Sequence, residues 1–323
     1  MKLPFVSVIT ACAALLFVLS ASDSLADILY VSNVQTRTIS KITSDGVLSI
    51  FARKGLSAPQ GLAFDSAGNL YVANLFNPPI AKFTKDGVDS VFVSKGAGDP
   101  IGLAFDRAGN LYVANSNSNT IEKFTSDGVG SIFAQTGLLT PHDLAFDRAG
   151  NLYVVNFYKN TVEKFSPTGT DLGVFASTGM DEPCCMAFDG SGNLYVGSAK
   201  KNTIEKFSPT GKDLGEFASK GVNQPGGMAF DSAGNLYVAN IDGTIEKLSP
   251  TGADLGVFAS KGLHGPRRLA FTDDAGVPLK LADRAQPPPV WVVVAIVLAA
   301  VLVLGAGAFT VLRRRRGTRL TKP

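Results

Sequence analysis

Short runs of apolar residues alternate with polar turns along most of the chain, and the alternation returns at a regular interval. One copy of the pattern holds four such runs, Gly102–Asp106, Leu111–Asn115, Ile121–Phe124 and Ser131–Ala134. Runs of this length, bounded by Gly, Asp, Asn and Ser, are typical of β-strands. Because they carry apolar residues on both faces, we expect small sheets that stack between similar sheets, away from water.

Two sequence markers show that the copies are repeats. The Tyr of a Leu-Tyr-Val motif recurs six times at spacings of 41 or 42 residues, as Tyr30, Tyr71, Tyr112, Tyr153, Tyr195 and Tyr237. The Phe of a Leu/Met-Ala-Phe motif also recurs six times, as Phe64, Phe105, Phe146, Phe188, Phe230 and Phe271. A four-stranded unit of about 40 residues that repeats radially is the blade of a β-propeller.

The two series are out of phase, which predicts how the ring closes. The first copy begins at Asp27 with no Ala-Phe strand before it, and the last copy ends at Phe271 with no Tyr strand after it. We therefore expect the last strand to complete the first sheet, which would remove the exposed edges of an open array. The predicted fold class is all-β, a six-bladed β-propeller of four-stranded blades at residues 27–273, closed by pairing of the N- and C-terminal strands.

The residues that carry the repeats resemble a known group of proteins. Gly102–Asp106, Gly109–Asn115 and Ile121–Phe124 are similar to segments of the six-bladed NHL-repeat propellers, among them the gluconolactonase and streptogramin-lyase-like propellers. The resemblance covers Asp27 to about Asp273. It implies the fold, but the group contains hydrolases, lyases and binding platforms, so it does not choose a function.

Both ends of the chain carry targeting signals. Lys2, an apolar run and small residues at Ser24 and Ala26 predict a secretory signal peptide at residues 1–26. Residues 290–312 form an uncharged stretch long enough for a transmembrane helix, and the Arg cluster that follows predicts a cytoplasmic tail at 313–323. The expected protein is exported through the secretory pathway and is a single-pass protein of the cell membrane, with the propeller outside and the C-terminus in the cytoplasm.

A proline-containing linker at residues 274–289 joins the propeller to the apolar stretch. Together with that stretch and the Arg cluster, the Pro287-Pro288-Pro289 run resembles the PEP-CTERM type of bacterial sorting tail. The resemblance implies removal of the tail by a sorting enzyme, while a permanent membrane anchor is the alternative, and the sequence leaves both open.

The charge distribution excludes one class of partner. The net charge of +3 comes from cations at the two ends of the chain, and the region between them is mildly acidic. Since nucleic-acid binding depends on clustered positive charge, we expect no nucleic-acid partner.

One pair of positions differs in every copy and gives the candidate site. After a loop Pro, the pairs are Gln60-Gly61, Ile101-Gly102, His142-Asp143, Cys184-Cys185, Gly226-Gly227 and Arg267-Arg268. The blade pattern places these pairs around one end of the central channel. The candidate ligand-binding residues of this channel rim are Gln60, His142, Asp143, Cys184, Cys185, Arg267 and Arg268, with solvated loop residues as the alternative interpretation.

Each kind of side chain at the rim points to a different chemistry. Arg267 and Arg268 offer fork-shaped donors for a carboxylate or phosphate. His142 beside Asp143 suits a base or metal ligand, or a solvated rim histidine. Cys184 and Cys185 are free thiols, a vicinal disulfide or half of a soft-metal site, and the sequence does not choose among these.

A second series ends the predicted second strands and gives a possible polar ring in the channel: Asn33, Asn74, Asn115, Asn156 and Asn240, with Ser198 in the remaining copy. Amide oxygens suit Ca²⁺ or another divalent ion, although hydrogen bonding within the following loop explains an Asn shared by five copies better. Two further repeated features predict structure alone. Glu-Lys pairs such as Glu122-Lys123 indicate solvated faces, and the Asp-x-Ala-Gly-Asn turns lack the additional acidic ligands of a calcium loop.

These observations favour a non-catalytic binding or scaffold module with no cofactor, which recognises an extracytoplasmic protein or a small anionic ligand. The competing hypothesis is a lactone or ester hydrolase of the gluconolactonase type, with a divalent ion in the channel near His142, Asp143 and Asn156. Any enzymatic activity would then be hydrolysis.

Overall fold

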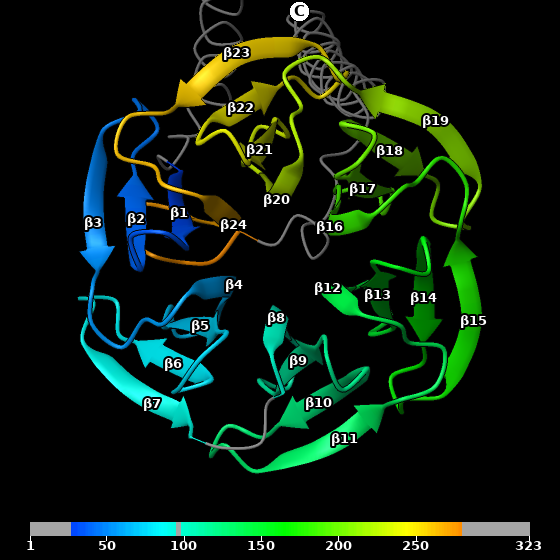
Figure 1. The fold of residues 1–323 in the computed structure, drawn as a ribbon, viewed down its shortest axis with the longest axis horizontal. Helices are drawn as coiled ribbons and strands as arrows, with labels where there is room; N and C mark the ends of the chain where they lie inside the picture. Colours follow the sequence, from blue (N-terminus) through cyan, green and yellow to red (C-terminus); the bar gives the residue numbers. More distant parts are fainter. Residues whose placement is uncertain (1–26, 95–97, 280–323) are drawn as a thin grey trace, which may run out of the picture. The chain divides into compact units, whose positions relative to one another are not determined.

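The computed structural model describes residues 27–94 and 98–279, and these form a ring of six four-stranded antiparallel sheets around a central channel (Figure 1). The fold class predicted for this region, an all-β six-bladed propeller, is confirmed. The chain divides into two compact units, residues 1–284 and 285–323, and every described residue belongs to the first.

The strands fall into four positions within each blade. The innermost strands are β4 (Pro59–Phe64), β8 (Pro100–Phe105), β12 (Pro141–Phe146), β16 (Pro183–Phe188), β20 (Pro225–Phe230) and β24 (Pro266–Thr272). The second strands are β1 (Ile28–Asn33), β5 (Leu70–Asn74), β9 (Leu111–Asn115), β13 (Leu152–Asn156), β17 (Leu194–Ser198) and β21 (Leu236–Asn240). The third strands are β2 (Thr38–Ile42), β6 (Ile80–Phe83), β10 (Thr120–Phe124), β14 (Thr161–Phe165), β18 (Thr203–Phe207) and β22 (Ile245–Leu248). The outermost strands are β3 (Leu48–Ala52), β7 (Asp89–Val93), β11 (Gly130–Ala134), β15 (Asp171–Ala176), β19 (Asp213–Ala218) and β23 (Asp254–Ala259).

The ring closes as the two out-of-phase series predict. Strand β24 pairs antiparallel with β1, with Ala270 opposite Tyr30 and Phe271 opposite Leu29, and completes the sheet β24-β1-β2-β3. The predicted pairing of N- and C-terminal strands is therefore confirmed. Each innermost strand begins at the Pro that the sequence placed in a loop, because a Pro at the first position of a strand removes no necessary ladder hydrogen bond.

The conserved spacing of Tyr and Phe has a packing explanation. Each repeat Tyr makes edge-to-face contacts with a Phe of its own outermost strand and with the Phe that ends the innermost strand of the next blade. Tyr237 makes the same contact with Phe271 of β24, at a centroid distance of 5.0 Å. Such pairs contribute about 0.5–1.5 kcal/mol each beyond the area they bury, so the six Tyr residues hold neighbouring blades together.

The Glu-Lys pairs of the third strands differ from the expectation of solvated faces. Glu163, Glu205 and Glu246 are buried, and burial beside Asp254 raises the pKa of Glu246 to about 7. The lysines lie against the repeat tyrosines, with Lys247 Nζ 4.9 Å from the Tyr237 ring centroid. Strand alternation explains the difference, since the two members of a pair point to opposite faces of a sheet, and the three glutamates lie against the loops that lead into their blades.

The Asp-x-Ala-Gly-Asn turns are closed by their own carboxylates. Asp106 Oδ1 accepts the Asn110 backbone N–H at 2.8 Å, and Asp106 Oδ2 accepts the Asn110 side-chain amide at 2.8 Å. Gly109 occupies the left-handed position that the turn requires, with φ of 84°. The same arrangement recurs at Asp147, Asp189 and Asp231, so these carboxylates are used in turn construction.

The targeting signals predicted from the sequence lie at the two ends of the chain. The signal peptide at 1–26, the transmembrane helix at 290–312 and the cytoplasmic tail at 313–323 lie outside the described residues, as does the linker from residue 280 onward. Within the described part of the chain, no helix has the length and apolar character needed to cross a bilayer.

Candidate functional site

Every innermost strand starts with the same three backbone features, and these position the rim side chains. The residue before the Pro has a left-handed conformation, with φ of 50° at Thr140 and 54° at Glu182. The Pro follows, and a register shift comes directly after it, between Pro141 and Asp143 in β12 and between Pro183 and Cys185 in β16. A β-bulge of this kind re-aims side chains, and here it affects the two variable positions.

The structure separates the two arginines that the sequence placed together at the rim. Arg267 is exposed, whereas Arg268 is buried with 8% of its surface accessible. The Arg268 guanidinium donates to the backbone carbonyls of His142 at 2.7 Å, Cys184 at 3.1 Å and Gly226. Because these carbonyls belong to β12, β16 and β20, the Arg268 side chain links three other blades to β24. It thereby closes the channel at this end.

Asp143 is the ionic partner of Arg268 and has no free carboxylate oxygen. Its Oδ1 lies 3.8 Å from Arg268 Nε and accepts the Leu144 backbone N–H, and its Oδ2 accepts the Met186 backbone N–H at 2.9 Å. Burial raises the pKa of Asp143, and the Arg268 charge and the two backbone donors act in the opposite direction. Asp143 therefore joins β12 to β16 and does not face solvent as a rim carboxylate.

His142 lies at the rim, packed on an aromatic ring from the same blade. Its imidazole stacks on Phe157, which follows β13, with ring centroids 4.3 Å apart and an interplanar angle of 27°. Burial and the charges of Arg268 and Arg267 lower the pKa of His142 to about 3. The imidazole is therefore neutral near pH 7 and adds no positive charge to the rim.

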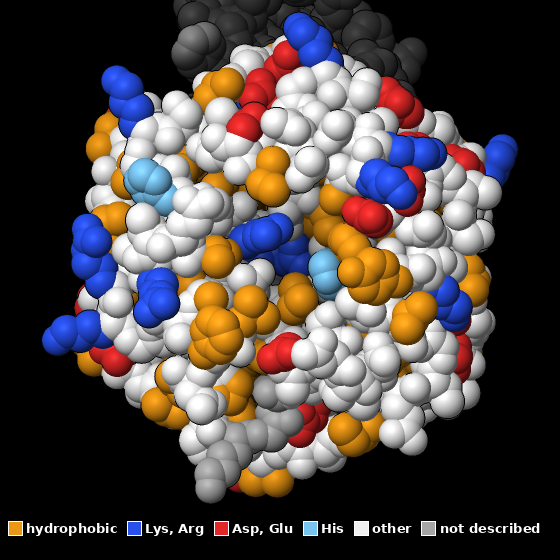
Figure 2. Space-filling view, viewed as in Figure 1, with side chains coloured by type: hydrophobic (Ala, Val, Ile, Leu, Met, Phe, Trp, Pro, Cys, Tyr) orange, Lys and Arg blue, Asp and Glu red, His pale blue; other side chains and the backbone are white. Residues whose placement is uncertain are grey.

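The accessible part of the site is here called the rim patch and consists of the exposed Arg267 and Tyr158 with the half-buried His142 and Phe157. Figure 2 views the face on which the innermost strands begin and shows cationic side chains at its centre, with a histidine and apolar side chains beside them. Tyr158 is 68% exposed and packs on Phe157 at a centroid distance of 4.9 Å. The sequence interpretation missed both aromatic residues, although no other copy has two aromatic residues directly after the Asn or Ser of this series.

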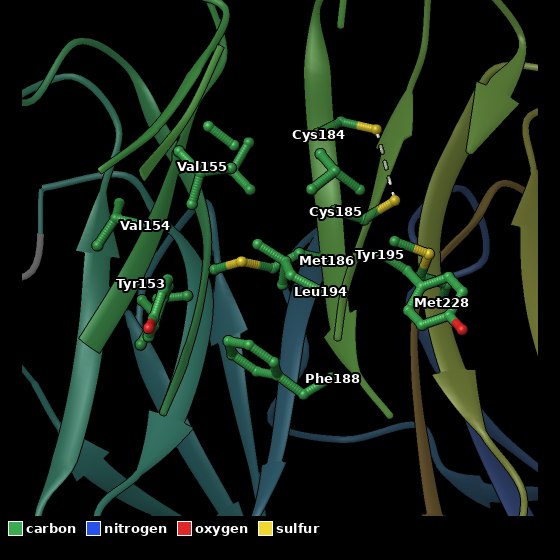
Figure 3. Packing of buried hydrophobic residues seen from close by; sticks show 14 of the residues in the cluster. Tyr153, Val154, Val155, Cys184, Cys185, Met186, Phe188, Leu194, Tyr195 and Met228 are labelled. Carbon is green, nitrogen blue, oxygen red and sulfur yellow. Dashed lines mark hydrogen bonds between the residues drawn. The ribbon is translucent and has the colours of Figure 1, made fainter. Parts of the chain in front are cut away.

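Cys184 and Cys185 are free thiols, buried along β16, with their sulfur atoms 3.7 Å apart (Figure 3). Cys184 Sγ donates to the carbonyl of Pro225 at 2.6 Å, which adds another contact between β16 and β20. The hydrogen bond with the Cys184 thiol, together with burial, raises the pKa of Cys185. Both thiols are buried packing groups between blades, and the raised pKa of Cys185 disfavours its thiolate form.

The remaining rim pairs allow close approach of the strands. Gln60 is buried, and its backbone carbonyl accepts the Ser32 hydroxyl at 2.8 Å. A Cβ at Gly102 would lie 2.9 Å from the Asp143 Cα, and one at Gly227 would lie 2.1 Å from the Arg267 carbonyl oxygen. Only glycine fits these positions, because the innermost strands converge on the channel there.

The Asn series is engaged by the loops of its own blades. Asn156 Oδ1 accepts the Leu139 backbone N–H at 3.0 Å, and its Nδ2 donates to the Gly137 carbonyl at 3.0 Å. Asn74 and Asn240 make equivalent pairs of hydrogen bonds, and Asn33 accepts the His264 N–H. Asn115 is buried at the same position and donates to Glu122. These side-chain amides are therefore used in hydrogen bonds to nearby loops, which is the interpretation that the sequence favoured. They lie on the second strands, one strand away from the channel.

The residues considered for a divalent ion do not fit one. Asp143 lies beside the Arg268 guanidinium, and both ends of the Asn156 amide are bonded to a loop. A cation at this place would have to displace Arg268 and would meet its positive charge. Among the residues that the structure describes, no three His, Cys, Asp or Glu side chains are grouped as metal ligands.

Comparison with solved structures identifies proteins of the same fold. Nidogen, in the structure of the nidogen/laminin complex, matches with a TM-score of 0.69 and 20% identity over 76% of this chain and 98% of that one. A streptogramin B lyase matches with a TM-score of 0.57 and 14% identity over 78% and 83% of the two chains. The gluconolactonase XC5397 from Xanthomonas campestris matches with a TM-score of 0.57 and 21% identity over 67% and 82%. The chain shares the six-bladed propeller fold with all three.

These proteins include both binding and enzymatic propellers, and identities this low establish the fold alone. Searches of known protein families and of curated proteins give no match.

Proposed function

We propose that this protein is a non-catalytic recognition module, exported and held at the membrane by its C-terminal stretch, and that the rim patch binds an anionic group of an extracytoplasmic partner. The observation that carries the proposal is the pairing of an exposed Arg267 with a buried Arg268 at the centre of the channel. The Arg268 side chain is hydrogen-bonded within the ring, and the Arg267 side chain is exposed to solvent.

The electrostatics of the pair favour an anion. Adjacent guanidinium groups repel each other, and the partial burial of the Arg267 side chain together with the charge of Arg268 lowers the pKa of Arg267. A bound carboxylate or phosphate would relieve this repulsion and could accept two parallel hydrogen bonds from the Arg267 fork. Since the Arg268 side chain is already bonded to three carbonyls, Arg267 is the donor available to a ligand.

The surroundings of Arg267 suit recognition rather than turnover. His142 is held neutral on Phe157, and Asp143 forms an ion pair with Arg268 and accepts hydrogen bonds from two backbone N–H groups, so neither is arranged as a base beside an open substrate position. The blades fix the rim, so little ordering is needed on binding. The similarity to nidogen, a propeller found in a complex with laminin, supports a binding role of this kind.

Titration of the purified full-length chain with citrate, a trivalent anion, tests the proposal. We expect binding by calorimetry at low ionic strength that weakens with added salt, and a loss of about tenfold or more in Arg267→Ala. Arg53→Ala, which removes an exposed arginine in the loop between β3 and β4, is the matched control and should keep the wild-type affinity. Equal loss in both variants, or no citrate binding by the wild-type chain, would contradict the proposal.

The hydrolase alternative has a separate measurement. Elemental analysis and assay of gluconolactone hydrolysis, each with and without a chelator, should show no stoichiometric ion and no chelator-sensitive activity. A stoichiometric ion whose removal by the chelator also abolishes lactone hydrolysis would show that the protein is an enzyme and would contradict the proposed recognition module.

A further inference from the structure

The end of the channel opposite the rim patch widens into a cavity of about 380 Å³. Its wall contains the alanine of every Leu/Met-Ala-Phe motif, so that all six blades contribute one methyl group: Ala63, Ala104, Ala145, Ala187, Ala229 and Ala270. Phenylalanines that follow these alanines also line it, among them Phe105 and Phe146. The cavity exists because the smallest apolar side chain faces it from each blade.

The cavity is closed on the rim side by polar contacts. Two residues before Ala270 and Ala145 on the same strands lie Arg268 and Asp143, which bridge the channel. Arg268 also bonds the carbonyls of β12, β16 and β20. The channel is therefore divided into a cationic rim and a blind apolar pocket that opens on the opposite face.

Among the described residues that line the cavity, the charged side chains come from turns that follow the innermost strands. Asp106, Arg107 and Asp147, from the turns that follow β8 and β12, line the cavity together with the six-blade apolar wall. A ligand that matches this arrangement has an apolar body and a polar end. The pocket volume falls in the lower part of the range of about 300–1,000 Å³ for small-molecule sites, which suits a slender body.

We infer that this cavity binds the unbranched alkyl chain of a fatty acid or lipid, with the methyl end toward Arg268 and Asp143 and the polar head at the level of Asp106, Arg107 and Asp147. An alkyl chain needs no hydrogen-bond partner along its length, and the alanine wall offers no side-chain partner. The binding free energy comes from removal of the alkyl chain from water.

The last two described residues of the chain reach the cavity. Pro278 and Leu279 line the same cavity, and the uncharged stretch at 290–312 begins eleven residues after Leu279.

A series of sodium alkanoates from hexanoate to tetradecanoate, titrated calorimetrically into the full-length chain below their micelle concentrations, tests the inference. Affinity should rise about fourfold for each added methylene and level off at the length that fills the cavity. No binding, or an affinity that does not depend on chain length, would overturn the inference.

Filling the cavity provides the matched variants. Ala145→Leu/Ala270→Leu places two larger side chains in the alanine ring and should reduce dodecanoate affinity at least about tenfold. Ala253→Leu, the same change at an exposed turn between β22 and β23, should leave the affinity unchanged. Should the double variant fail to fold, Ala187→Met alone serves the same purpose, with its melting temperature as the check on folding. Unchanged affinity in a folded filled variant would show that the alkyl chain binds elsewhere.

Two arms distinguish the sources of the alkyl chain. Dodecanoate binding in the absence of membranes indicates a free fatty acid. Mass spectrometry of an organic extract of the purified chain, together with transfer of a labelled lipid from phosphatidylcholine vesicles, indicates a membrane lipid. Either source supports the alkyl-chain site provided that Ala145→Leu/Ala270→Leu abolishes the signal and Ala253→Leu does not.

Discussion

Arg268 on β24 lies 3.8 Å from Asp143 on β12, Nε to Oδ1, although the two strands belong to blades on opposite sides of the ring (Figure 1). A side chain from the last strand of the chain thus contacts the middle of the repeat array across the channel. Arg268 therefore has a structural role in the ring, whereas its neighbour Arg267 lies at the surface.

Arg268→Met should lower the free energy of unfolding by about 3–5 kcal/mol, because it leaves the buried Asp143 without an ionic partner and three carbonyls without donors. Arg267→Met should change it by less than about 0.5 kcal/mol, since that side chain is exposed. Chemical denaturation of both variants measures the difference. Asp143→Leu combined with Arg268→Met should recover part of the loss, and similar values for the two single variants would refute the structural role of Arg268.

The pH dependence of stability should contain a contribution from His142. Its pKa is about 3 in the folded chain and near 6.5 unfolded, so below pH 6.5 the unfolded state takes up a proton that the folded state does not. Stability is therefore lost as the pH falls from 6.5 toward 3, with a slope of up to about 1.4 kcal/mol per pH unit from this group. Denaturation of His142→Gln at several pH values should show a shallower slope than the wild-type chain. His264→Gln, at an exposed position, should retain the wild-type slope.

Closure of the ring should depend on Phe271. Phe271→Ala removes a buried ring that packs on Tyr237 and should cost about 3–5 kcal/mol. Hydrogen exchange should become faster at the amides of β1 and β24 before it does in the blade of β12–β15. Phe76→Ala, at a side chain 63% exposed, should leave both stability and exchange unchanged. Uniform acceleration across all blades would mean that β24 is not the weak point of the ring.

The thiols of β16 should resist alkylation in the folded chain. Cys184 and Cys185 are buried and therefore poorly accessible, and the raised pKa of Cys185 also lowers the thiolate content of that residue. Iodoacetamide at pH 8 followed by peptide mass analysis should find both residues unmodified without denaturant and modified in its presence. Rapid modification of the native chain would show that these thiols are exposed at the rim and would contradict the prediction.

The left-handed residues before the rim prolines should be a source of strain. Thr140 has φ of 50°, a conformation unfavourable for a β-branched residue, whereas the equivalent residue before Pro266 is Gly265, with φ of 61°. Thr140→Gly should therefore raise the free energy of unfolding by up to about 1 kcal/mol, and Gly265→Ala should lower it by a similar amount. Thermal melting of the two variants checks both signs, and destabilisation by Thr140→Gly would show that no strain is stored there.

The sequence predicted the blades well because their signals are local. Leu111–Asn115 is the observed β9, and the predicted third and fourth runs differ from β10 and β11 by one residue at the start. The rim was found because its residues vary between otherwise similar copies. The roles of those residues were not predictable, because the β-bulge after each Pro changes the direction of the side chains and leaves no mark in the residue pattern.

By itself, the sequence determined the number of blades, the phase of the closing strand and the set of variable rim positions, since repetition and alternation are properties of neighbouring residues. The tertiary structure alone decided that Arg268 is buried and Arg267 exposed, that Asp143 is bonded across the channel, and that six alanines enclose a blind cavity. These outcomes depend on which strands meet at the centre of the ring. Residues about 125 positions apart come into contact there because the ring closes, and no local pattern encodes that distance.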